Sequence, residues 1–153
     1  MAKQGKMFND QDYRLWVLLN QVRDAVFKAR QKELNQYNIS ATQAATLLVI
    51  EAIGPKATAS EISRQLFRKP HSVCGADGIL GRMEKKGLVR RLKDLDRKNL
   101  VRVVLTEKGR QAYYQSTKQE SIRQIMSSLS EEERQQLTSC LHTLRDKAFA
   151  FLD

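Results

Sequence analysis

Apolar residues recur at helical spacing near both ends of the chain. The first region predicts a long helix from about residue 9 to residue 37, with one apolar stripe. The stripe consists of Leu15, Leu19, Val22 and Val26. A final helix is predicted after residue 130, and its apolar side consists of Leu137, Leu141, Leu144, Ala148 and Phe151. A single chain would leave these stripes largely uncovered, so the pattern predicts that two copies pair through them.

Shorter elements are predicted between the two long helices. The apolar segment at residues 40–53 is typical of a buried helix, which Gly54-Pro55 ends. Thr58 and Glu61 fit a capping box, in which each side chain bonds the backbone N–H of the other residue. The box opens a short helix that is followed by a turn at residues 68–71.

A basic hairpin is predicted at residues 88–105. Two short runs rich in Val, Leu and Arg, residues 88–92 and 100–105, flank a polar turn. A two-stranded ribbon is not stable alone, so it must pack against its neighbours. Helix, helix, basic hairpin is the order of a winged helix-turn-helix, in which the hairpin is the wing. The order therefore predicts a mainly α-helical fold with a small β-hairpin wing, and double-stranded DNA as the partner.

The positive charge of the chain is concentrated in the same region. The 153 residues carry a formal net charge of +10, which indicates a polyanionic partner. Residues 61–110 contain 14 Lys and Arg and 6 Asp and Glu, so eight of the ten excess positive charges lie there. This concentration favours DNA binding by the winged region. An architectural protein that binds nucleic acid without sequence specificity is an alternative, because it would share the charge.

The residues expected to contact DNA lie near helix starts and on the hairpin. Hydroxyl groups and cations near a helix start can contact phosphates and bases, although capping and solvation alone are the alternative there. Cations at a wing tip are attracted by the negative potential of a minor groove, and an acidic residue can hold the tip by bonding local cations or amides. The predicted residues are Thr58, Ser60, Arg68, Lys69, His71, Ser72, Arg90, Asp96, Arg97 and Lys98.

Three segments resemble the MarR family of bacterial transcriptional regulators. They are EKKGLVRR at 84–91, DRK at 96–98 and LTEKG at 105–109. The family pattern at the wing tip is Asp-x-Arg, whereas here Lys98 takes the third position and Arg97 precedes it, which leaves open which of them enters the groove.

The resemblance also has implications for the whole chain. It implies a single domain over residues 1–153, in which residues 8–38 and 107–153 supply the dimerisation helices and residues 40–105 form a winged lobe. The implied activity is that of a homodimeric repressor that binds a palindromic operator and is released by a small-molecule effector.

The second helix of the helix-turn-helix departs from this pattern. It is expected from near Ser72 to Gly87, but glycines at positions 75, 78 and 81 lie inside it. Each glycine costs about 1 kcal/mol relative to Ala in a helix interior. The helix is therefore expected to be kinked, to start late or to become ordered only on DNA. After the hairpin, a further helix is predicted over residues 106–128.

Aromatic and thiol side chains suggest two further roles. Trp16, Phe27 and Tyr113 are expected to line an effector pocket for a small aromatic ligand, because MarR-like regulators often release DNA on binding such ligands. Ordinary core packing is the alternative for these side chains. Cys74 lies in the DNA-reading segment, where oxidation would add polarity and bulk, so redox sensing is a second hypothesis. The absence of an activating cation pair or a neighbouring second Cys favours a free structural thiol.

Other function classes lack support in the sequence. The two histidines are far apart, and there is no paired Cys motif or glycine-rich phosphate loop, so no enzyme activity, cofactor or metal site is predicted. No apolar run approaches the length of a membrane span, and no membrane partner is expected. Two well-separated cysteines fit a reducing cytoplasm. We therefore expect a cytoplasmic, sequence-specific DNA-binding regulator.

Overall fold

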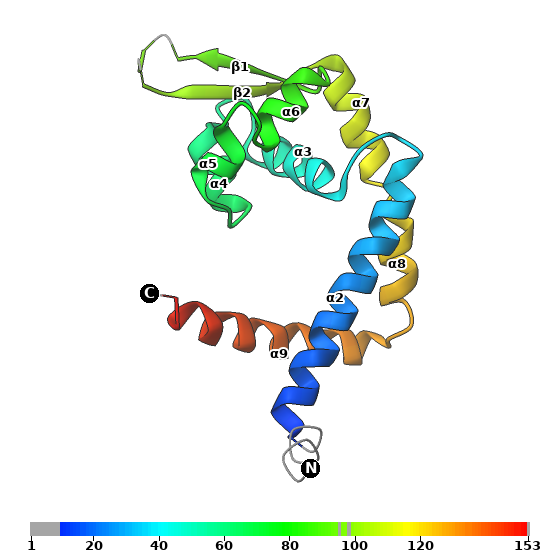
Figure 1. The fold of residues 1–153 in the computed structure, drawn as a ribbon. Coiled ribbons are helices and arrows are strands. Elements are labelled where there is room, and N and C mark those ends of the chain that lie inside the picture. Colours follow the sequence, from blue (N-terminus) through cyan, green and yellow to red (C-terminus); the bar gives the residue numbers. More distant parts are fainter. Residues whose placement is uncertain (1–9, 95, 98, 153) are drawn as a thin grey trace, which may run out of the picture. The chain divides into compact units, whose positions relative to one another are not determined.

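The computed structural model describes residues 10–94, 96, 97 and 99–152, and the chain divides into two units between Gln119 and Glu120 (Figure 1). Helices make up most of both units. The first unit also contains an antiparallel hairpin. The prediction of a mainly α-helical fold with a small β-hairpin wing is confirmed.

The elements follow the predicted order along the chain. In the first unit they are α2 (Gln11–Asn35), α3 (Ala41–Ile53), α4 (Ala59–Gln65), α5 (Pro70–Cys74), α6 (Ile79–Lys85), β1 (Val89–Lys93), β2 (Val101–Leu105) and α7 (Glu107–Ser116). In the second unit they are α8 (Glu120–Met126) and α9 (Glu131–Ala150).

Helix α4 begins at Thr58, the capping residue that the sequence predicts, and α3 begins at a similar cap, Ser40. The Ser40 hydroxyl accepts a hydrogen bond from the backbone N–H of Gln43 at 3.0 Å, and the backbone N–H of Ser40 donates to Gln43 Oε1 at 3.1 Å. Thr58 and Glu61 form the same reciprocal pair at the start of α4, at 3.3 and 3.2 Å. Each box satisfies two backbone N–H groups that would otherwise lack a partner, and so fixes where its helix begins.

The hydrophobic core of the lobe gathers around α3. All the elements of residues 40–105 contribute apolar side chains to it, and burying each large one contributes about 1.5–3 kcal/mol. Its largest buried apolar members are Leu47, Ile62, Val73, Leu80, Met83, Val89 and Val103. At the other end of the unit, Arg30 in α2 pairs with Glu33 at 3.0 Å and donates to the Ser116 carbonyl at 2.6 Å. The hydrogen bond to Ser116 joins α2 to the end of α7.

The wing pairs β1 with β2 in antiparallel register, with Val89 opposite Leu105 and Arg91 opposite Val103. The segment before α4 extends this pairing, because the backbone N–H of Val103 donates to the Ala57 carbonyl at 2.9 Å. An isolated bridge also joins Thr58 to Arg102. The hairpin is therefore anchored to the start of the helix-turn-helix. The sequence pattern did not predict that the segment before α4 pairs with β2.

The expectation of one helix from Ser72 to Gly87 is wrong. Instead, α5 ends at Cys74 and α6 begins at Ile79, with residues 75–78 in a turn between them. Gly81 explains the arrangement, because a Cβ built there would lie 2.0 Å from the Ala76 carbonyl oxygen. The glycine lets the backbone of the turn pack directly against α6, and this contact cannot be read from local sequence.

Two other boundaries also differ from prediction. The turn after α4 falls at residues 66–69, so that α5 already begins at Pro70, a residue favoured in the first turn of a helix. The helix predicted over residues 106–128 is interrupted between Ser116 and Glu120, where Gln119 has a positive φ of 50°.

Apolar side chains of the long helices are exposed in the single chain. On α2 they include Leu15, Leu19 and Val22, and on α9 they include Leu137, Leu141 and Leu144. Leu34 is the buried residue of α2, whereas no residue of α9 is buried. Among the described residues, no helix is long and apolar enough to cross a membrane.

Candidate nucleic-acid interface

Four of the predicted contact residues of the helix-turn-helix lie around the start of α5. Arg68, Lys69 and His71 are exposed, and Ser72 is half-buried. The Ser72 hydroxyl donates to the Lys69 carbonyl at 2.8 Å and so braces the turn. Three exposed side chains that can be cationic or donate hydrogen bonds therefore project from one turn of the lobe.

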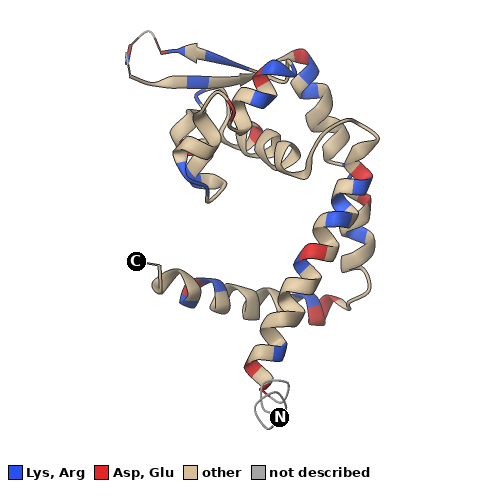
Figure 2. Ribbon diagram, in the orientation of Figure 1, with Lys and Arg blue, Asp and Glu red and all other residues tan. Residues whose placement is uncertain are grey.

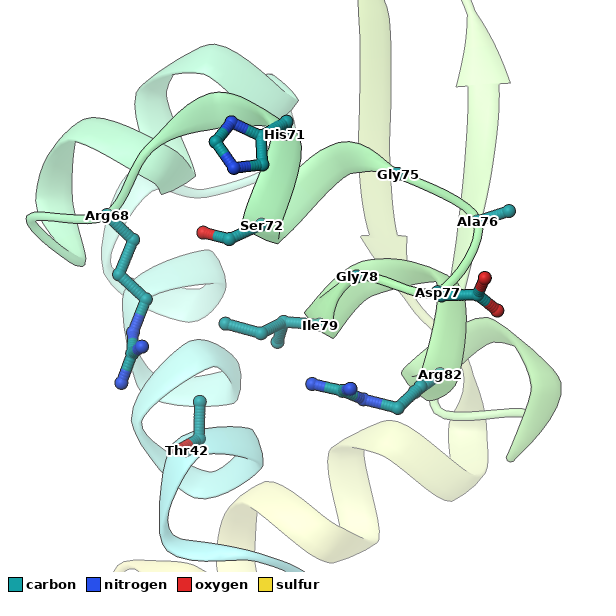
Figure 3. A pocket seen from close by; sticks show the side chains of 10 residues that line it. All are labelled: Thr42, Arg68, His71, Ser72, Gly75, Ala76, Asp77, Gly78, Ile79 and Arg82. Carbon is teal, nitrogen blue, oxygen red and sulfur yellow. The ribbon is translucent and has the colours of Figure 1, made fainter.

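A surface cavity of about 530 Å³ lies beside this turn (Figure 3). Its walls come from the start of α3, the turn before α5, and the segment between α5 and α6. Arg68 and Arg82 both extend into the hollow, with Thr42 between them at its edge. Asp77 also lines the cavity, but its carboxylate points away from it in Figure 3.

Arg91 links both halves of the recognition segment to the wing. Its Nη1 donates to the Cys74 carbonyl at 2.8 Å, and its Nη2 lies 3.1 Å from Glu84 Oε1. The backbone N–H of Arg91 donates to the other Glu84 oxygen at 3.1 Å. The side-chain and backbone hydrogen bonds from Arg91 hold the pKa of Glu84 below its usual range. Arg91 was not among the predicted site residues, because its role depends on how α5, α6 and β1 pack.

The wing presents Arg90 on β1 and Arg97 near its tip, and both are exposed. Lys98 lies outside the described residues. Asp94, which was not predicted, makes the bonds that were expected of Asp96. Its two oxygens accept from the backbone N–H of Asp96 and from Arg102 Nε, both at 2.9 Å.

These bonds have an electrostatic consequence at the base of the wing tip. The hydrogen bond from the Asp96 N–H, helped by the nearby Arg102 guanidinium, holds the pKa of Asp94 below its usual range. Asp94 therefore stays ionised at neutral pH and braces the turn that carries Arg97.

Thr58 and Ser60 occupy the start of α4. Thr58 is half-buried, and its hydroxyl accepts the capping hydrogen bond from Glu61. Ser60 is exposed. The structure therefore supports the capping role for Thr58 and leaves the hydroxyl of Ser60 at the surface.

Tyr113 lines a second cavity, of about 400 Å³, with residues of α3, β2 and α7 that include Ile50, Glu51 and Arg110. Trp16 and Phe27 are exposed on α2 and do not line this cavity. The single chain therefore does not bring the three predicted effector residues together.

Cys74 is half-buried at the end of α5, and its Sγ lies 3.7 Å from the Ser63 hydroxyl. Cys140 is exposed on α9, and both thiols are free. Within the described parts of the chain, no group of three or more His, Cys, Asp and Glu could hold a metal ion.

Lys and Arg residues cluster along the hairpin and at the turn before α5, as the blue segments of Figure 2 show. The fold that displays them has solved relatives. The ligand-free structure of the organohalide-sensing transcriptional regulator RdhR matches at 32% sequence identity and a TM-score of 0.84, covering 93% of this chain and 83% of that chain. A MarR mutant from E. coli in complex with operator DNA matches at 23% identity and a TM-score of 0.77, covering 86% of this chain and 93% of that chain.

The chain belongs to the MarR family of transcriptional regulators. RdhR bound to 2,4-dichlorophenol also matches this MarR-family chain, at 33% identity and a TM-score of 0.81, over 90% of this chain and 81% of that chain. No protein-family model and no curated protein matches the sequence.

Proposed function

We propose that this MarR-family chain is a sequence-specific DNA-binding repressor. The observation that carries the proposal is the set of exposed cations on the winged lobe. Arg68 and Lys69 lie at the turn before α5, and Arg90 and Arg97 lie on the wing. Phosphate contacts by such cations position a protein on DNA, while side chains near the recognition segment, such as His71, read base edges.

The proposed repressor acts as a homodimer on a palindromic operator. The exposed apolar stripes of α2 and α9 support this, because large apolar patches on a soluble chain mark interaction surfaces. Two-fold symmetry would present two recognition segments to successive turns of the duplex, about 34–36 Å apart. We propose the cytoplasm as the place of action, because it gives access to chromosomal DNA.

A small aromatic compound is the proposed effector. RdhR, which is 33% identical to this chain over the aligned region, has been seen with 2,4-dichlorophenol. In this chain the cavity beside Tyr113 combines an aromatic ring with Glu51 and Arg110. Ligand binding there would touch α3, β2 and α7 and could change how the wing is held.

A footprint on the DNA that flanks its own gene tests the proposed function. The expected result is protection of a palindromic site, with affinity at least about 10³-fold higher than for unrelated duplex at the same salt concentration. An affinity ratio near one would instead support a non-specific architectural protein. Loss of the footprint on adding chlorinated phenols would support the effector class.

A further inference from the structure

The cavity between α5 and α6 is built from parts of the chain that are far apart in sequence. Thr42 comes from the start of α3, Arg68 from the turn before α5, and Arg82 from α6 (Figure 3). The turn at residues 75–78 forms one wall. The turn that interrupts the predicted recognition helix therefore also lines the cavity.

The cavity carries two positive charges that are not paired with a carboxylate. Among the described residues, neither Arg68 nor Arg82 has an ion pair, whereas Arg91 and Arg102 each do. Asp77 is the carboxylate on the rim, but its Oδ1 lies 3.8 Å from Lys85 Nζ and it is directed away from the hollow. Two guanidinium groups that face one hollow therefore lack a neutralising partner.

We propose that this cavity binds one phosphodiester group of the DNA backbone, contacted by both Arg68 and Arg82. The inference rests on the proposed function and assigns two residues, Thr42 and Arg82, that the sequence did not indicate. A guanidinium group can donate two parallel hydrogen bonds to two oxygens of one phosphate, and this bidentate geometry makes it well suited to the contact. Two converging positive charges favour an anionic group over the neutral edge of a base. The Thr42 hydroxyl at the rim supplies a further hydrogen-bond donor.

A methylphosphonate scan of the operator tests the inference. Duplexes that each carry one neutral phosphate replacement are titrated with the full-length protein, its Arg68→Gln variant and its Arg82→Gln variant, and binding is followed by fluorescence anisotropy. The wild-type protein should lose affinity at the phosphate that the cavity holds. Both variants should be less sensitive than the wild type to replacement of that same phosphate, and each should flatten the dependence of log Kd on log salt concentration by up to about one.

Lys28→Gln is the matched control, because Lys28 is an exposed cation on α2 of the same unit that does not line this cavity. It should retain sensitivity to the phosphate in question. Circular dichroism checks that all variants are folded, which is expected because both cavity arginines are exposed.

Three outcomes would overturn the inference. If the two variants lose sensitivity at different phosphates, or at none, the shared site is wrong even though specific binding by the wild type upholds the proposed function. If inorganic phosphate binds the cavity below millimolar concentration without DNA, the site is one for a small free anion. If the wild type shows no specific binding to any duplex, the proposed function and this inference fail together.

Discussion

Phe67 has a backbone conformation that suits glycine. Its φ is 52°, in the left-handed region, and its side chain is 76% exposed. Left-handed backbone costs a residue with a Cβ about 1–2 kcal/mol. We predict that Phe67→Gly is more stable to urea than Phe67→Ala by about 1 kcal/mol, because both lose the ring but only glycine relieves the strain. Equal unfolding midpoints for the two variants would show that the turn carries no such strain.

Glu84 makes the stability of the lobe sensitive to acid. Its hydrogen bonds with Arg91 lower the pKa of the carboxyl below its ordinary value of 4.5. The ionised Glu84 carboxylate therefore stabilises the folded protein, and this contribution is fully present above pH 4.5. It is lost as the pH falls through the lowered pKa of the folded state. The pair is partly exposed, so it is worth no more than about 1 kcal/mol.

We therefore predict that Glu84→Gln unfolds more easily than wild type at neutral pH, and that the difference shrinks as the solution is acidified below pH 4.5. Urea titrations of both proteins across this range measure it. A difference that stays constant down to strong acid would mean that the ionised carboxylate is not the stabilising form.

At the scale of elements, Gly81 determines whether the recognition segment is one helix or two. Alanine is the better helix former by about 1 kcal/mol, so Gly81→Ala should stabilise a continuous helix. In the structure, however, the added Cβ would lie 2.0 Å from the Ala76 carbonyl oxygen. We predict that Gly81→Ala lowers the free energy of unfolding by about 1–3 kcal/mol, as overpacking does. Lys85→Ala, at an exposed position of α6, is the control for helix propensity and should change stability little. If Gly81→Ala were more stable than the wild type, the close contact between Gly81 and Ala76 would not be what interrupts the helix.

The elements that the sequence predicts well are those with local causes. The starts of α3 and α4 depend on side chains three residues from the cap, Ser40 with Gln43 and Thr58 with Glu61. The break before α6 depends instead on the backbone of Ala76 packing against Gly81, which only the folded chain brings together. The glycines gave a reason to expect disruption but could not say where the helix would stop.

At the scale of the whole molecule, the candidate site also contains some residues that the sequence predicts and others that only the folded chain reveals. Charge and motif were enough to select Arg68 and Arg97, because an exposed cation needs no particular neighbour. Thr42 and Arg82 could not be selected, since the cavity that they share is made by α3, α5 and α6 packing together. Asp94 was missed for a similar reason, because its role depends on Arg102 of the opposite strand.

The apolar stripe of α9 makes a test of the assembly possible. Leu141 is 43% exposed in the single chain, so a charge there should not disturb the fold of one copy. We predict that Leu141→Glu has the mass of a monomer by light scattering at micromolar concentration, whereas the wild type has the mass of a dimer. Burying an unpaired carboxylate in an interface costs several kcal/mol, enough to lower a dimer's affinity by orders of magnitude.

Ser139→Glu is the matched control, because position 139 lies on the opposite side of α9 at 100° per residue and the added charge would remain in solvent. It should remain a dimer and bind operator DNA as the wild type does. Leu141→Glu should retain weak binding to single half-sites but lose the preference for a palindrome, since that preference requires two lobes held by one assembly. A dimeric Leu141→Glu protein with normal operator binding would exclude this stripe from the subunit contact.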